Sequence, residues 1–180
     1  MDRDTVHTHI NSLFQTVCIE VFEAHGSSAV LCDQSDVDGL NSAPIAVIDA
    51  GSQDFEILAL LVIPMSVLSL TYPMQDEIIN VDESELEDWL GEFSNQTIGR
   101  LKNKLLNHNC RLDLGLPDTY FDSNLQEVLA DKNKLTQYSF KIDQEYVNTY
   151  LGIEFLTDEL RFDLEDTQDT SAGEGELELF

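Results

Sequence analysis

The amino-acid sequence predicts an α+β domain in which an antiparallel sheet carries two long helices. Apolar residues recur at three- and four-residue spacing over 6–24 and 84–107, the period of an amphipathic helix. Strand-like segments, rich in β-branched residues or alternating between apolar and polar ones, are 45–50, 55–63, 112–116, 138–142 and 151–155.

The first predicted helix covers residues 6–24. Its apolar stripe consists of Val6, Ile10, Leu13, Phe14, Val17, Cys18, Val21 and Phe22. Gly26-Ser27-Ser28 follows and is expected to end the helix.

A β-hairpin is predicted next, because two apolar runs flank the turn Gly51-Ser52-Gln53. The uncharged stretch from Ile57 to Gln75 approaches the length of a membrane span. Pro64 and Pro73 interrupt it, and acidic residues stand at its flanks where basic anchors would be expected. We therefore interpret it as a buried strand followed by a second buried segment, with no membrane insertion.

The second helix, residues 84–107, carries the clearest local signals. Ser84 and Glu87 form the pattern of a capping box at its start. Acidic residues crowd the first turn and basic residues the last turns, which complements the helix dipole. The buried face is predicted to be Leu86, Leu90, Phe93, Thr97, Leu101 and Leu105, and Asn107-His108-Asn109 to end the helix.

The remaining chain is predicted to complete the sheet. Segment 118–131 is expected to be a loop with a short helical piece at 125–130, and the last two strands are expected to be joined around 144–149. Residues 1–157 would then form the folded domain. The segment 158–180 is so acidic that we expect a solvated, largely disordered tail.

Composition narrows the function classes. The 180 residues include 35 acidic and 9 basic ones, a net charge of −26, which disfavours binding to nucleic acids or anionic membranes. The three cysteines form no CxxC pair and no apolar signal region opens the chain, so a reduced, cytoplasmic protein is expected. Glycine-rich nucleotide loops and the G-x-S-x-G nucleophile motif are missing from the sequence.

One face of the second predicted helix carries a stripe of polar residues that could act in catalysis or binding. At about 100° per residue, Asp88, Glu92, Asn95 and Gly99 fall on one line, roughly opposite the apolar face. Glu92 and Asn95 should therefore project side by side into solvent, and Gly99 should leave room for another molecule to approach. By itself, such a pair also fits an ordinary solvated helix face.

The wider pattern is more specific. The motif Asp88-x-x-x-Glu92-x-x-Asn95, followed after 21 intervening residues by Pro117, resembles the signature of the CheC/CheX/FliY family of bacterial chemotaxis phosphatases. The resemblance covers roughly residues 5–157. Only one E-x-x-N copy is present, which is similar to the single-site CheX branch.

The resemblance implies a CheC/CheX-like fold, a homodimer and a phosphatase that acts on the phospho-aspartate of a CheY-like response regulator. It implies that Asn95 positions the attacking water and that Glu92 docks the regulator's active-site lysine. Asp88 and Gly99 would belong to the docking face, and Pro117 would be structural. No cofactor or metal of the chain's own is implied, because Mg²⁺ would arrive with the regulator.

Two alternatives remain at the level of sequence. The chain could be a non-catalytic module that binds a regulator on the same fold, or an acidic α+β domain in which E-x-x-N is accidental. The sequence also departs from the family, because Gln96-Thr97-Ile98 replaces the apolar residues often found after the asparagine. We expect that change to alter packing but not the projecting face.

Overall fold

The computed structural model describes residues 2–33, 40–73, 81–130, 132 and 134–164. Its elements, in chain order, are α1 (Arg3–Ala24), β1 (Ala29–Cys32), the 3-10 turn η2 (Leu40–Ser42), β2 (Ile45–Gly51), β3 (Phe55–Val62), α2 (Met65–Thr71), α3 (Glu83–Leu106), β4 (Asp113–Leu114), β5 (Asp118–Tyr120), α4 (Leu125–Ala130), β6 (Thr136–Ile142) and β7 (Glu145–Phe155). The predicted α+β class, with an antiparallel sheet and two long helices, is confirmed.

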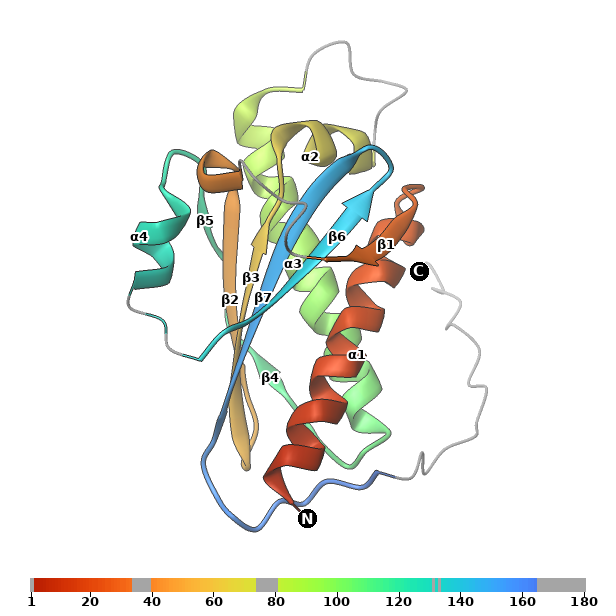
Figure 1. Cartoon of the computed structure of the whole chain (residues 1–180), viewed down its shortest axis with the longest axis vertical. Helices are drawn as coiled ribbons and strands as arrows, with labels where there is room; N and C mark the ends of the chain where they lie inside the picture. Colours follow the sequence, from red (N-terminus) through yellow and green to blue (C-terminus); the bar gives the residue numbers. More distant parts are fainter. Residues whose placement is uncertain (1, 34–39, 74–80, 131, 133, 165–180) are drawn as a thin grey trace, which may run out of the picture.

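The sheet is antiparallel at every pairing, in the order β1-β6-β7-β3-β2-β4, and β5 also pairs with β2. Its centre is the long ladder between β3 and β7, which runs from Phe55 opposite Phe155 to Val62 opposite Asn148. Strand β1 therefore lies at one edge, next to β6 (Figure 1).

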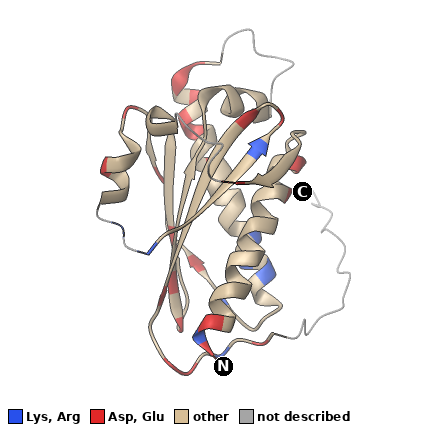
Figure 2. Cartoon of the chain, in the orientation of Figure 1, with Lys and Arg blue, Asp and Glu red and all other residues tan. Residues whose placement is uncertain are grey.

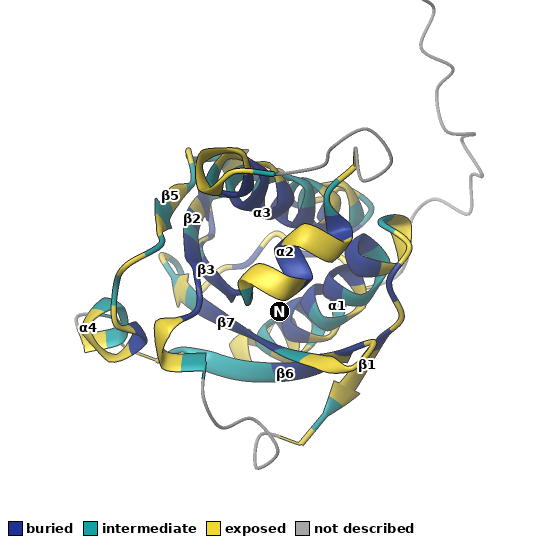
Figure 3. Cartoon of the chain, turned by 90° about the horizontal axis from the view of Figure 1, so that it is seen from above, coloured by how far each residue is buried: buried dark blue, intermediate teal, exposed yellow. Residues whose placement is uncertain are grey.

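The elements form layers around one main core. Helices α1 and α3 lie side by side on one face of the sheet, and the sheet curves around them with α2 at one end (Figure 3). On the opposite face, α4 packs through Leu125 on a smaller cluster that includes Ile45, Leu60 and Tyr150. This arrangement leaves one long side of α3 at the molecular surface.

Both predicted helix faces are buried as expected. Every apolar residue of the α1 stripe is buried except Leu13, which is half-buried. Every residue of the predicted α3 face is buried as well. The helical spacing of apolar residues thus located the core side of each helix correctly.

The capping box of α3 begins two residues earlier than predicted, and the helix starts at Glu83 instead of residue 84. The capping box is formed by Asp82 and Glu85, not by Ser84 and Glu87: Asp82 Oδ1 accepts from the Glu85 backbone N–H at 2.9 Å, and Glu85 Oε2 accepts from the Asp82 N–H at 3.0 Å. Aspartate caps a helix as well as serine does, and the earlier box lets the helix begin one residue sooner. Glu87 instead accepts a hydrogen bond of 2.9 Å from Thr119, which ties α3 to β5.

The strands also contain corrections. The hairpin of β2 and β3 is confirmed. The predicted loop at 144–149 is wrong, because β7 already begins at Glu145 after a tight turn in which Asp143 has φ 53°. Aspartate tolerates this left-handed conformation better than most residues. Only Asp113–Leu114 of the predicted strand 112–116 pairs with the sheet, and β1 and β5 were not predicted.

The second buried segment of the stretch from Ile57 is the short helix α2, which buries Val67, Leu68 and Thr71. The Thr71 hydroxyl accepts a 3.1 Å hydrogen bond from the indole of Trp89, so α2 is fastened to α3. Positions 74 and 75 lie outside the described residues. Over the described part of the chain, no helix combines the length and the apolarity needed to span a membrane.

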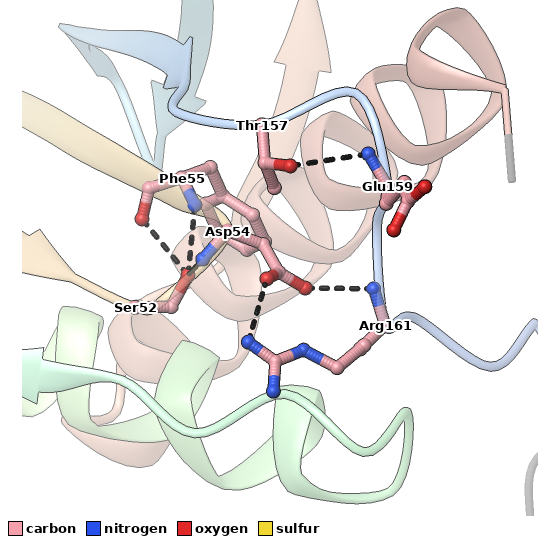
Figure 4. Close-up of polar contacts among 6 residues, drawn as sticks. All are labelled: Ser52, Asp54, Phe55, Thr157, Glu159 and Arg161. Carbon is pink, nitrogen blue, oxygen red and sulfur yellow. Dashed lines mark hydrogen bonds and ion pairs between the residues drawn. The ribbon is translucent and has the colours of Figure 1, made fainter.

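The expected domain boundary at 157 falls before a segment that packs onto the fold. Leu160 and Phe162 are buried in the main core. The carboxylate of Asp54 accepts from the Arg161 backbone N–H at 2.7 Å and lies 3.3 Å from its guanidinium, as Figure 4 shows. Residues 158–164 therefore belong to the domain, and their acidity concealed the two buried apolar side chains. Positions 165–180 of the expected tail lie outside the described residues.

Candidate functional site

The candidate site is the exposed side of α3, and contacts with α1 and α2 hold this helix in place. The ring of Phe93 packs on that of Phe22, with centroids 4.8 Å apart. Farther along, Lys104 forms an ion pair of 2.8 Å with Glu20 of α1. Together with the Trp89 bond to α2, these contacts make α3 a rigid support for its surface residues.

The four residues of the predicted stripe are accessible along this side. Asp88 and Glu92 are exposed, whereas Asn95 and Gly99 are half-buried. A Cβ atom built at Gly99 would meet no heavy atom within 4 Å, so the surface there is open. The prediction that Glu92 and Asn95 project from one face of α3, next to an open glycine, agrees with this geometry.

The Asn95 amide is available for an outside ligand. Across the described residues, no hydrogen bond engages its side chain. The neighbouring hydroxyls are satisfied within the helix, because Ser94 donates to the Gly91 carbonyl and Thr97 to the Phe93 carbonyl, both at 2.8 Å. An amide can donate to and accept from one water molecule, which is the property needed to orient it.

Pro117 lies beside the same helix. A Cβ atom at Gly91 would be 3.7 Å from the proline Cγ, so the loop between β4 and β5 touches α3 one residue before Glu92. The structural role of Pro117 stays a prediction. The preceding residue of the same loop, Leu116, is an apolar side chain that is 87% exposed.

Sequence reasoning missed two residues that contact Glu92 directly or through a neighbour. Gln96 donates a 3.0 Å hydrogen bond from Nε2 to Glu92 Oε1. The Oε1 atom of Gln96 lies 2.9 Å from His25 Nε2. Gln96 was noticed as a departure from the family pattern, but no local signal connects it to His25, which is 71 residues away.

Charges and possible metal ligands are distributed unevenly. Acidic side chains are spread over the molecule, whereas the few Lys and Arg residues include a group on the second half of α3 (Figure 2). No group of three or more His, Cys, Asp or Glu side chains that could hold a metal ion occurs among the residues that the structure covers. The half-buried His9 of α1 and His108, just after α3, approach each other, and their Nε2 atoms are 3.1 Å apart.

Comparison with known proteins identifies the fold. No family model matches the chain, and no curated protein sequence matches it. Among solved structures, a chemotaxis protein CheX from Desulfovibrio desulfuricans is similar at 14% identity and a TM-score of 0.63, over 81% of this chain and 99% of that one. CheX from Vibrio vulnificus has 13% identity and a TM-score of 0.65, over 81% and 96%.

A third structure is a complex. It is described as CheX with CheY, BeF₃ and Mg²⁺ from Borrelia burgdorferi, and it matches at 10% identity and a TM-score of 0.58, over 80% of this chain and 97% of that one. These structures share the antiparallel sheet and helices of the present chain. The chain therefore has the fold of the CheX and CheC-like chemotaxis proteins.

Proposed function

We propose that this protein removes the phosphoryl group from the phospho-aspartate of a CheY-like response regulator. The observation that carries the proposal is the placement of Glu92 and Asn95, one turn apart, on the accessible side of a firmly packed helix. One structural neighbour is a complex of CheX with CheY, which supports a regulator of this class as the partner.

The chemistry requires little from the protein beyond positioning. An acyl phosphate is reactive, so a catalyst has mainly to place a water in line with the phosphorus and stabilise the transition state. The Asn95 amide would enter the regulator's site and hold that water. The water oxygen attacks phosphorus, the aspartyl oxygen leaves as a carboxylate, and the water's proton passes to solvent or to the released phosphate.

Glu92 would supply docking. A carboxylate that meets the ammonium group of the regulator's active-site lysine forms a charge-assisted hydrogen bond. Because Glu92 is one turn before Asn95, this bond would set the direction in which the amide points. Asp88 extends the same face, and the open surface at Gly99 would admit the regulator's backbone. Mg²⁺ belongs to the phosphorylated regulator in this proposal and is part of the substrate.

The proposal includes a cytoplasmic homodimer. Strand β1 stands at a sheet edge, and Val30 and Leu31 on it are 59% and 44% exposed. Apolar side chains on an unpaired edge favour pairing with a second chain. Sedimentation equilibrium of the purified protein tests this part, and a monomer at micromolar concentration would contradict it.

The deciding experiment measures loss of the acyl phosphate from a CheY-like regulator, phosphorylated with acetyl phosphate and Mg²⁺, with and without this protein. Wild type is expected to accelerate the loss. Asn95→Ala should abolish the acceleration while binding persists, and Glu92→Ala should weaken both. Gln126→Ala and Glu127→Ala on α4 are the controls, because they remove an exposed amide and an exposed carboxylate on a different helix.

The outcomes separate the alternatives. If wild type binds the phosphorylated regulator but leaves the lifetime of its acyl phosphate unchanged, the protein is a binding module and the enzymatic proposal is wrong. If it neither binds nor accelerates, the exposed pair on α3 has no role toward such a regulator. Circular dichroism shows that each variant remains folded.

A further inference from the structure

We infer that Gln96 is a positioning residue for Glu92 and that His25 holds Gln96 in place. This inference rests on the proposed function of Glu92 and deepens it. The three side chains form a line from the end of α1 to the exposed side of α3, with hydrogen bonds of 2.9 Å from His25 to Gln96 and 3.0 Å from Gln96 to Glu92.

The direction of each hydrogen bond follows from the carboxylate of Glu92. An ionised carboxylate can only accept, so the group of Gln96 that faces Glu92 must be its NH₂. The carbonyl oxygen of the same amide then faces His25. Because this oxygen also can only accept, His25 must carry a proton on Nε2 and donate it. The charge of Glu92 therefore determines the amide orientation of Gln96 and the tautomer of a neutral His25.

His25 is held from several sides. It caps the C-terminus of α1, and the chain reverses directly after it at Gly26, which has φ 81°. Its ring meets the ring of Trp89 edge-on, with centroids 4.8 Å apart, and lies 5.8 Å from that of Phe93. Trp89 is itself bonded to Thr71 of α2. The imidazole therefore has little freedom to rotate away from Gln96.

The consequence for Glu92 is a partly restricted carboxylate. Exposed glutamates sample many rotamers, and the loss of this freedom on binding lowers affinity. Gln96 occupies Oε1 and leaves Oε2 for a cation of the partner. The protein would thus restrict the docking side chain before the regulator arrives. Asn95 forms no part of this line, so removing Gln96 should affect docking much more than the chemical step.

The test uses Gln96→Met, which keeps the length of the side chain but removes both polar groups. With a CheY-like regulator phosphorylated by acetyl phosphate and Mg²⁺, KM should rise roughly three- to tenfold, a range set by the cost of ordering one long side chain, while kcat stays within about twofold. The dissociation constant for the same regulator activated with BeF₃ should rise by the same factor. Gln126→Met on α4 makes the same replacement at an exposed site and should change neither quantity.

A double-mutant cycle shows whether Gln96 acts through Glu92. In a Glu92→Ala background, Gln96→Met should have no further effect on KM or on the dissociation constant. His25→Phe preserves an aromatic ring against Trp89 but removes the donor, and it should reproduce part of the Gln96→Met effect. Melting temperatures of all variants separate this effect from a loss of folding.

The measurements distinguish a failure of the positioning inference from a failure of the proposed function. If Glu92→Ala weakens docking but Gln96→Met and His25→Phe do not, the positioning inference is wrong and the proposed function stands. An equal effect of Gln96→Met in both backgrounds also overturns the inference, because Gln96 would then act independently of Glu92. If Glu92→Ala changes neither KM nor binding, the proposed docking role fails, and the inference fails with it.

Discussion

Pro117 packs against Gly91, and a Cβ atom added at residue 91 would lie 3.7 Å from the proline Cγ. Gly91 is therefore covered by its own chain at ordinary contact distance. Gly99, two turns farther along α3, has nothing within 4 Å of the same position. Gly91 is thus covered by another part of the chain, whereas Gly99 is open to solvent. A side chain added at Gly99 could therefore meet a bound partner, and one added at Gly91 could not.

Gly99→Ala is expected to stabilise the folded protein and to weaken binding of the regulator. Alanine is favoured over glycine inside a helix by about 1 kcal/mol, and the open surface imposes no clash in the chain itself. If the regulator approaches closely here, the added methyl group should lower affinity roughly tenfold, which corresponds to modest overpacking of a contact. Urea unfolding and titration with the BeF₃-activated regulator measure the two effects.

Gly91→Ala is the control for this prediction. Its methyl group would meet Pro117 and Thr119 at 3.7 and 3.8 Å, which is ordinary contact, so a similar gain in stability is expected without loss of affinity. Unchanged binding by the Gly99→Ala variant would show that the regulator does not approach α3 at this point.

Phe162→Ala should destabilise the domain by about 3 kcal/mol, the usual cost of removing a buried aromatic side chain. Phe162 is only 4% exposed, and its ring stacks on that of His108 with centroids 5.2 Å apart. Leu156→Ala, at a side chain that is 53% exposed, should cost much less. Chemical denaturation of the three proteins measures the difference. Equal stabilities would mean that the segment after 157 contributes nothing to the folded state.

Local patterns in the sequence were sufficient for the long elements and for the exposed stripe. The helical period of the apolar residues determined which sides of α1 and α3 are buried, and hence that Glu92 lies on the outside. Strands β1 and β5 escaped prediction because they are short and partly exposed, so only their pairing with β6 and β2 defines them. The contact of Gln96 with His25 depends on how α1 packs on α3, which no local pattern encodes.

Stability should fall as the pH rises above 9, because two thiols are buried. Burial raises the pKa of Cys18 from 9.0 to about 12 and that of Cys110 from 9.0 to about 11. Above pH 9 the unfolded chain releases these protons while the folded chain retains them, so unfolding becomes more favourable. The loss of stability from the Cys18 thiol should be about 1 kcal/mol per pH unit between pH 9 and its folded-state pKa, and the loss from the less deeply buried Cys110 thiol should be smaller.

The measurement is urea unfolding at pH 8 to 11, for wild type and for Cys18→Ala. The variant should lose some stability at pH 8 because of the smaller side chain, but its stability should decline less steeply above pH 9. Burial also raises the pKa values of Tyr138 and Tyr150, so a residual decline is expected in the variant. Parallel pH profiles for the two proteins would contradict an effect of the Cys18 thiol.

Leu116 is expected to contribute to regulator docking through apolar contact. A leucine that is 87% exposed contributes little to folding, and the loop that carries it lies against α3 at Gly91, the residue before Glu92. Leu116→Ser should therefore leave the free energy of unfolding within about 0.5 kcal/mol of wild type, as for most surface substitutions. Burial of most of one leucine side chain at an interface contributes about 1–2 kcal/mol, so affinity for the BeF₃-activated regulator should fall roughly five- to thirtyfold. Leu70→Ser on α2, at a residue that is 42% exposed and outside the stripe, should bind as wild type does; equal affinities of all three proteins would exclude the loop between β4 and β5 from the docking surface.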